Sequence, residues 1–247
     1  MSVIKTELAT FFPTPFLFCD LSKKTTKQLE TAVIKDFRND CEDFDTYLKT
    51  KNAEEDHQLK QNLTSFCKAE GFPIYQSKQE LQLNPDFNFI LRDIFSACRA
   101  FEGETNIEVD KFEVSMMWSN IYRKGGHNPE HFHPNSFLSG IICVNDPIAD
   151  IATLKKENYG GTTFYSPINQ NFVIVPTTKK EGSAFYTPTV IPQVKRGNMI
   201  IFPSWLRHAA TPYPGVEDIN DFRITVSFNI MIRGNAGKKE QLTWNRF

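Results

Sequence analysis

The sequence predicts a mainly β protein with flanking α-helices, built on a β-sandwich or jelly roll. Three observations lead to this fold class. From about residue 110 onward, apolar and polar residues alternate in short runs with a period of two, the pattern of half-buried strands. Gly, Pro and Asn separate these runs, as in the Lys-Gly-Gly at 124–126 and the Tyr-Gly-Gly at 159–161. Before residue 110, the apolar residues follow the period of amphipathic helices instead.

Helices are predicted over residues 24–50, 54–70 and 84–102, where charged and apolar positions alternate at helical spacing. The third has the clearest start, because Asn84 suits an N-cap and Pro85 suits the first helical position. Its apolar stripe consists of Phe87, Ile90, Leu91, Ile94 and Phe95. We expect the helices to pack one face against the outside of the sandwich and to expose the other.

Short strand-like runs fill most of the chain after residue 110. They cover 111–122, 136–145, 162–165, 171–176, 184–191, 198–203 and 222–232. Their close succession favours a sandwich or jelly roll over alternating βαβ units. A chain of 247 residues, 40% of them hydrophobic, can bury one sizeable core. We therefore expect a single domain over 1–247, with a helical elaboration at 1–110, a jelly-roll core at 111–233 and a tail at 234–247.

Charge and cysteine content narrow the class of partner. The chain carries 28 Lys and Arg against 29 Asp and Glu, a net charge of −1, which argues against nucleic acid as the main partner. Five scattered cysteines without a C-x-x-C pair suit reduced thiols better than a disulfide framework. The sequence shows no leader peptide and no apolar run of bilayer length. These observations predict a cytoplasmic protein without a membrane partner, and leave its oligomeric state open.

Three of the five histidines fall within residues 127–133, which suggests a metal site. In a strand, residues i and i+2 point to the same face, so His131 and His133 could bind one ion together. His208 ends the apolar run NMIIFPSWLRH and could supply a third imidazole from a distant strand. Such a set leaves coordination positions open for small molecules.

A second constellation lies in the predicted strand at 222–232. Its alternation places Arg223 on the same face as Thr225, Ser227 and Asn229. An arginine that faces the interior of a sandwich needs an anionic partner. Two partners fit: a dicarboxylic ligand, through the bidentate geometry that guanidinium favours, or a structural carboxylate at the rim.

Two segments resemble known sequences. IYRKGGHNPEHFHPNSFLSGIICVND (121–146) resembles the first iron-ligand segment of the prolyl-4-hydroxylase-like iron(II)/2-oxoglutarate oxygenases. GNMIIFPSWLRHAATPY (197–213), followed by FRITVSFN, resembles their second. The run H-x-H-P-x-S-x-x-S-G at 131–140 and the opening FFPTPFLFCDL are most similar to a microbial and phage branch of these oxygenases. The resemblance is specific over about 112–232, and it implies a double-stranded β-helix core with N-terminal helices.

For the metal, the resemblance implies that His131 and His208 bind Fe(II), with His133 at the position where the superfamily has a carboxylate. Imidazole in place of a carboxylate leaves the site more positive by one charge, which favours bound anions. A 2-His-1-carboxylate set is usual for this chemistry, so two alternatives for the third ligand stay open. They are His127 and Glu130, the latter if a loop turns its side chain toward the ion.

For the cosubstrate, the resemblance implies that Arg223 binds the C5 carboxylate of 2-oxoglutarate. Tyr122 lies roughly where relatives place a tyrosine hydroxyl near the same cosubstrate. Asn120 shares the face of Tyr122 in a regular strand, and Thr225 shares that of Arg223, so both are further candidates to bind the cosubstrate.

The function implied is an Fe(II)- and 2-oxoglutarate-dependent dioxygenase. It would use dioxygen to hydroxylate a primary substrate while 2-oxoglutarate is decarboxylated to succinate, with His131, His133, His208 and Arg223 as the catalytic set. Two other hypotheses remain: a three-histidine oxygenase that does not use 2-oxoglutarate, and a non-catalytic metal-binding β-sandwich. The sequence does not indicate the primary substrate.

Overall fold

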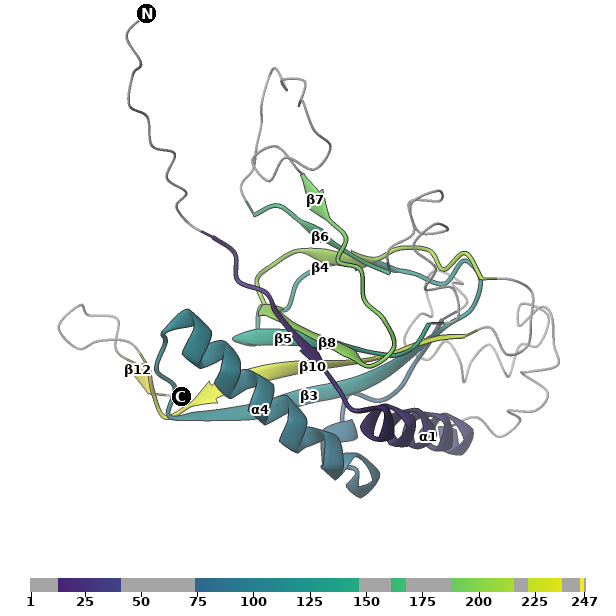
Figure 1. Ribbon diagram of the computed structural model, residues 1–247, viewed down its shortest axis with the longest axis horizontal. Helices are drawn as coiled ribbons and strands as arrows, with labels where there is room; N and C mark the ends of the chain where they lie inside the picture. Colours follow the sequence, from purple (N-terminus) through teal and green to yellow (C-terminus); the bar gives the residue numbers. More distant parts are fainter. Residues whose placement is uncertain are drawn as a thin grey trace, which may run out of the picture.

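Two antiparallel β-sheets form the centre of the protein (Figure 1). The computed structural model describes residues 13–40, 74–146, 161–167, 188–215, 222–236 and 245–246. Within these residues the larger sheet runs, in order, through β1 (Leu17–Asp20), β8 (Asn198–Pro203), β5 (Leu138–Asn145), β10 (Arg223–Arg233), β3 (Lys111–Tyr122) and β2 (Ile74–Gln76). The smaller sheet runs through β4 (Asn128–His131), β9 (His208–Ala210), β6 (Thr162–Tyr165) and β7 (Thr189–Val190). A short ribbon pairs β11 (Asn235–Ala236) with β12 (Asn245–Arg246).

Helices α1 (Lys23–Asp40) and α4 (Asn88–Thr105) lie against the outer face of the six-stranded sheet (Figure 1). Two 3-10 turns, η1 (Leu81–Leu83) and η2 (Pro85–Phe87), lead into α4. The Asn84 side chain caps this start by accepting a hydrogen bond from the Asp86 backbone N–H at 3.0 Å. The predicted Asn84 cap and Pro85 start are therefore present, but they begin the 3-10 turn η2, and α4 itself begins at Asn88.

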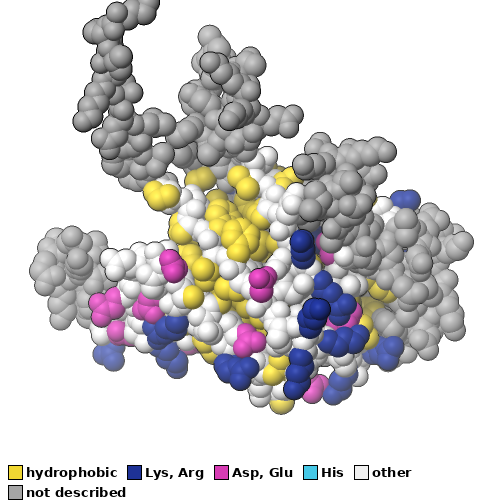
Figure 2. Space-filling model, viewed as in Figure 1, with side chains coloured by type: hydrophobic (Ala, Val, Ile, Leu, Met, Phe, Trp, Pro, Cys, Tyr) yellow, Lys and Arg dark blue, Asp and Glu magenta, His cyan; other side chains and the backbone are white. Residues whose placement is uncertain are grey.

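The other helix predictions have mixed outcomes. The first predicted helix (24–50) is described as α1 over Lys23–Asp40, and its remaining residues 41–50 lie outside the described residues, as does the helix predicted at 54–70. In α4 the buried positions include Ile90, Ile94 and Phe101, but Phe95 is 36% exposed and does not belong to the stripe. The Lys-rich outer face of α1 is exposed, as expected for an amphipathic helix (Figure 2).

Most predicted strands are present. Those at 111–122, 162–165 and 198–203 match β3, β6 and β8, and those at 136–145 and 222–232 match β5 and β10 to within two residues. Of the run 184–191, residues 189–190 form β7, and 171–176 lies outside the described residues. Strands β1, β2, β4 and β9, each of four residues or fewer, were not predicted, and neither was the ribbon of β11 and β12.

The alternation along β10 separates two environments, as predicted. Ile224, Val226, Phe228 and Ile230 join the main hydrophobic cluster, which also contains residues of α1 and α4. The intervening positions, which begin with Arg223, line a cavity on the other face of the sheet. Gly140 of β5 makes this packing possible, since a Cβ there would lie 2.1 Å from the Phe228 ring. Among the described residues, no helix is long and apolar enough to cross a membrane.

Candidate metal centre

Three histidine side chains meet on the cavity side of the smaller sheet. His131 of β4 pairs directly with His208 of β9, and the ring centroids lie 4.4 Å apart. His133 follows β4 in the chain, and its backbone N–H donates to the Ser204 carbonyl at 2.9 Å. Its ring centroid lies 5.1 Å from that of His131 and 5.2 Å from that of His208. One nitrogen of each imidazole lies within 4.8 Å of the others, so the three could hold one metal ion.

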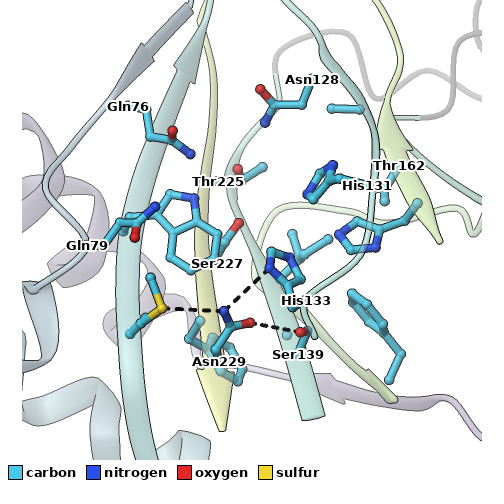
Figure 3. Close-up of a pocket in the computed structure, with 18 of the residues that line it drawn as sticks. Gln76, Gln79, Asn128, His131, His133, Ser139, Thr162, Thr225, Ser227 and Asn229 are labelled. Atoms are coloured by element: carbon cyan, nitrogen blue, oxygen red, sulfur yellow. Dashed lines mark hydrogen bonds between the residues drawn. The ribbon is translucent and has the colours of Figure 1, made fainter. Parts of the chain in front are cut away.

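The backbone brings the His131 and His133 rings together in a different way from the predicted one. The prediction placed His131 and His133 at alternate positions of one strand, but β4 ends at His131. A register shift between Asn128 and His131 and the backbone bond of His133 to Ser204 bring the two rings together instead. The smaller sheet therefore positions His131 and His208, and the bond to Ser204 positions His133; Figure 3 shows His131 and His133 at the cavity.

Backbone carbonyls fix two of the rings. His131 Nδ1 lies 2.7 Å from the Pro129 carbonyl, and His208 Nδ1 lies 2.9 Å from the Leu206 carbonyl. A carbonyl only accepts, so each Nδ1 carries the proton and each Nε2 presents a lone pair. This is the usual arrangement of metal-binding histidines, whose outer nitrogen is held by a second group.

The third ring rests against a polar pair of the larger sheet. His133 Nδ1 lies 3.5 Å from the Asn229 side-chain amide, and Asn229 Oδ1 accepts a hydrogen bond from Ser139 Oγ at 2.8 Å (Figure 3). Asn229 belongs to β10 and Ser139 to β5, where the two residues face each other in register. The contact ties His133 to the sheet that carries Arg223.

Burial keeps His133 and His208 uncharged at neutral pH. Desolvation, with a smaller contribution from the neighbouring imidazoles, lowers the pKa of His133 to about 4 and that of His208 to about 3. Neutral imidazole is the form that binds metals. The donor set therefore fits a divalent first-row transition metal.

The two alternative third ligands lie elsewhere. His127 lies outside the histidine cluster and its Nδ1 is 3.0 Å from the Gly125 carbonyl. The Glu130 carboxylate forms an ion pair with Arg207. Among the described residues, the structure brings neither to the cluster, whereas it brings His133 there.

A cavity of about 420 Å³ extends from the histidines between the two sheets. Tyr122, Arg223 and Thr225 line it, as the sequence predicted for cosubstrate-binding residues. Asn120 does not line it: its amide donates to Thr225 Oγ1 at 3.3 Å and to Ser227 Oγ at 3.2 Å. Asn120 is thus placed to hold polar side chains of β10, and its direct contact with a cosubstrate stays a prediction.

Arg223 is 1% exposed and is held from several sides. Its guanidinium lies 5.1 Å from the centroid of the Tyr122 ring, and Nη1 donates to the Gly161 carbonyl at 3.4 Å. Nε lies 3.6 Å from Asp146 Oδ2. Gly161 has a φ of +80°, and a Cβ there would lie 2.6 Å from Arg223 Nη2. The structural carboxylate considered in the sequence analysis is thus present, and it is Asp146.

Several residues of the cavity had no sequence signal. Asn128 donates to the Tyr122 hydroxyl at 3.0 Å, and Gln76 and Gln79 line the wall beside β2. Gly161 was recognised only as part of a turn. Each of these contacts joins segments that are distant in the chain, apart from the pair of Asn128 and Tyr122.

The chain is similar in sequence to one family and in fold to several solved structures. Residues 116–229 match a family described as "Putative 2OG-Fe(II) oxygenase". No curated protein sequence matches the chain. Among solved structures, the non-heme alpha ketoglutarate dependent carbocyclase SnoK from nogalamycin biosynthesis is similar, with a TM-score of 0.55, 11% identity, and coverage of 88% of this chain and 79% of that one.

Two further solved structures resemble the chain. AviO1 from Streptomyces viridochromogenes Tue57 has a TM-score of 0.50 and 10% identity, over 88% of this chain and 90% of that one. A Pseudomonas putida prolyl-4-hydroxylase has a TM-score of 0.48 and 10% identity, over 89% of this chain and 94% of that one. At such low identity the likeness to solved structures concerns the fold alone, and the predicted double-stranded β-helix with flanking helices is confirmed.

Proposed function

We propose that this chain, whose residues 116–229 match the 2OG-Fe(II) oxygenase family, hydroxylates a primary substrate with oxidative decarboxylation of 2-oxoglutarate to succinate. The observation that carries the proposal is the placement of three convergent imidazoles and a buried arginine in one cavity. His131, His133 and His208 are the proposed Fe(II) ligands, and Arg223 is the proposed cosubstrate-binding cation. When bound, the iron supplies the redox chemistry by which dioxygen oxidises the cosubstrate and the substrate.

The spacing of the two groups supports this assignment. In the smaller sheet His208 pairs with Phe164, and Arg223 donates to the carbonyl of Gly161, three residues earlier. Three residues of strand correspond to roughly 10 Å. A five-carbon dicarboxylate that binds a metal at one end can bridge this separation and reach the guanidinium with its other carboxylate.

Neighbouring residues define what the far carboxylate would meet. The guanidinium N–H groups of Arg223 could donate hydrogen bonds to this carboxylate. Thr225 and Tyr122, which carry hydroxyl groups, line the same cavity. Charge-assisted hydrogen bonds from a buried guanidinium are strong, because little water competes for them. Phe202 lines the cavity beside the histidines and limits the access of water to them.

A binding experiment tests the ligand set. Wild-type protein should bind one Fe(II) anaerobically, and addition of 2-oxoglutarate should then give a weak visible charge-transfer band. The His208→Ala variant should lose the iron, whereas Arg223→Ala should keep the iron and lose the band. His127→Ala is the matched control, since His127 lies four residues from His131 but outside the cluster. Stoichiometric iron in His208→Ala would show that the ligand set is wrong.

A turnover experiment tests the reaction. Iron-loaded protein with 2-oxoglutarate should release succinate when a substrate is present, and the substrate should gain one oxygen atom. The three-histidine set favours one second candidate, an oxygenase whose organic substrate itself binds the metal and places its acid group on Arg223. That enzyme would consume dioxygen without 2-oxoglutarate and release no succinate.

A further inference from the structure

Asp146 directly follows β5, and an irregularity near the end of this strand directs the Asp146 side chain toward Arg223. In the pairing of β5 with β10, Thr225 faces Cys143, but Ile224 faces Asn145, so Val144 is an extra residue in β5. Such a bulge changes which side chains of the strand point to a given face. The Asn145 side chain donates to the Phe222 carbonyl at 3.0 Å and anchors this end of β5 beside β10.

The resulting ion pair is almost completely buried. Asp146 Oδ2 lies 3.6 Å from Arg223 Nε, and the two side chains are 5% and 2% exposed. Removing either charge alone would take from the other a counter-charge 3.6 Å away in a poorly hydrated place, which is unfavourable. The negative charge of Asp146 therefore offsets the positive charge of Arg223 that an anion in the cavity would meet.

The negative charge of Asp146 equals the charge that the metal site lacks because its third position is His133 and not a carboxylate. A site with a 2-His-1-carboxylate metal centre and an arginine carries a formal charge of +2 with a divalent ion: the ion and the arginine contribute +3, and the carboxylate contributes −1. With three neutral imidazoles the carboxylate is missing from the metal, but among the described residues Asp146 restores the same sum beside Arg223. A dianionic cosubstrate then brings either arrangement to zero.

We infer that Asp146 takes over the charge of the absent metal-binding carboxylate from the far side of the cavity, and that it limits how strongly Arg223 selects an anionic group. The inference rests on the proposed function, because it concerns the same cosubstrate. It assigns Asp146 as a specificity-determining residue that acts through Arg223 and does not touch the metal.

Wild-type protein should show only a small preference for a distal carboxylate over a neutral group. The probes are 2-oxoglutarate and its 5-methyl ester, in which a neutral ester replaces the distal carboxylate. Because Asp146 offsets the charge of Arg223, the anaerobic Fe(II)-loaded protein should bind the two with dissociation constants within about tenfold of each other. A preference for 2-oxoglutarate of about a hundredfold or more would overturn the inference without any variant.

The Asp146→Asn variant provides the second measurement. Loss of the negative charge should tighten 2-oxoglutarate binding about tenfold or more, as expected for a unit charge a few ångströms away at an effective dielectric constant near 20. Binding of the 5-methyl ester should change much less. If Asp146 only orients the guanidinium, the same variant should bind both ligands more weakly, and the inference would be wrong. Glu108→Gln, which removes an exposed acid outside the cavity, is the matched control.

The exchange of charges can also be tested directly. His133→Asp adds a negative charge at the metal and should weaken 2-oxoglutarate binding about tenfold, measured by calorimetry on metal-saturated protein. The double variant His133→Asp/Asp146→Asn moves the carboxylate from Arg223 to the metal and should return the dissociation constant to within about threefold of wild type. Failure of wild type to bind Fe(II) and 2-oxoglutarate would refute the proposed function itself. Normal wild-type binding, with no recovery in the double variant, would refute only the role of Asp146.

Discussion

Acidification of the metal-free protein from pH 7 to pH 5 is expected to remove on the order of 4 kcal/mol of its free energy of unfolding through His133 and His208. Burial lowers the pKa of His133 from 6.5 to about 4 and that of His208 from 6.5 to about 3. The unfolded chain exposes both imidazoles, so it binds protons below pH 6.5 that the folded chain does not bind. Stability from these two groups is therefore complete above pH 6.5 and falls as the pH drops toward their folded-state pKa values.

The magnitude follows from the width of that window. Each pH unit between the unfolded and the folded pKa changes the free energy of unfolding by about 1.4 kcal/mol per group. From pH 6.5 to pH 5 this gives about 2 kcal/mol for each ring and about 4 kcal/mol for both. A divalent ion that binds only the folded protein should offset much of the loss at pH 6.

Urea denaturation in the presence of a chelator, at several pH values between 5 and 7, measures this effect. The His208→Phe variant replaces one titrating ring by an apolar ring, so its stability should depend on pH less steeply, by about 2 kcal/mol over the same range. His127→Gln, outside the cluster, should retain the wild-type dependence. Equal pH dependence in wild type and His208→Phe would refute the reasoning.

Two other predictions concern the ends of the cavity. Gly161→Ala should cost about 1 to 2 kcal/mol of stability because of its positive φ, and its Cβ should displace the Arg223 guanidinium and weaken 2-oxoglutarate binding about tenfold in calorimetry. Gly197→Ala, also at positive φ but outside the cavity, should lose similar stability and bind the cosubstrate as wild type does. Asn229→Leu should lower the affinity for Co(II) about tenfold, measured by competition with a chromogenic chelator, because His133 loses its second contact. Wild-type Co(II) affinity in that variant would exclude a positioning role for Asn229.

The parts of the site that the sequence could predict share one property: each follows from a local period or a local run. The face shared by Arg223 and Thr225 follows from strict alternation along β10, because one side of that strand must be apolar to pack on the helices. The histidine run at 127–133 is visible as a run, although the conformation that joins His131 and His133 is not the strand that was expected.

The remaining parts depend on contacts between distant segments. The partner of Arg223 is set by the single extra residue at Val144, and no local pattern marks that bulge. No local pattern singles out Asp146 either, since its place beside Arg223 follows from the long-range pairing of β5 with β10. Alternation along the strand placed Asn120 on the same face as Tyr122. Its amide, however, donates to two hydroxyl groups of β10, and such contacts between strands are set by tertiary structure.

Strand β10 connects the two ends of the proposed site. Arg223 at its start faces the cosubstrate end, and Asn229, on the same face, contacts His133 at the metal end. Pairing with β3 on one side and β5 on the other fixes this strand along its length. Since Val226 and Phe228 pack its opposite face into the core, the separation between the metal-binding rings and the guanidinium is set by the hydrophobic core rather than by the loops. Loops can then change the substrate without disturbing the cosubstrate geometry, which explains how one such framework can serve different substrates.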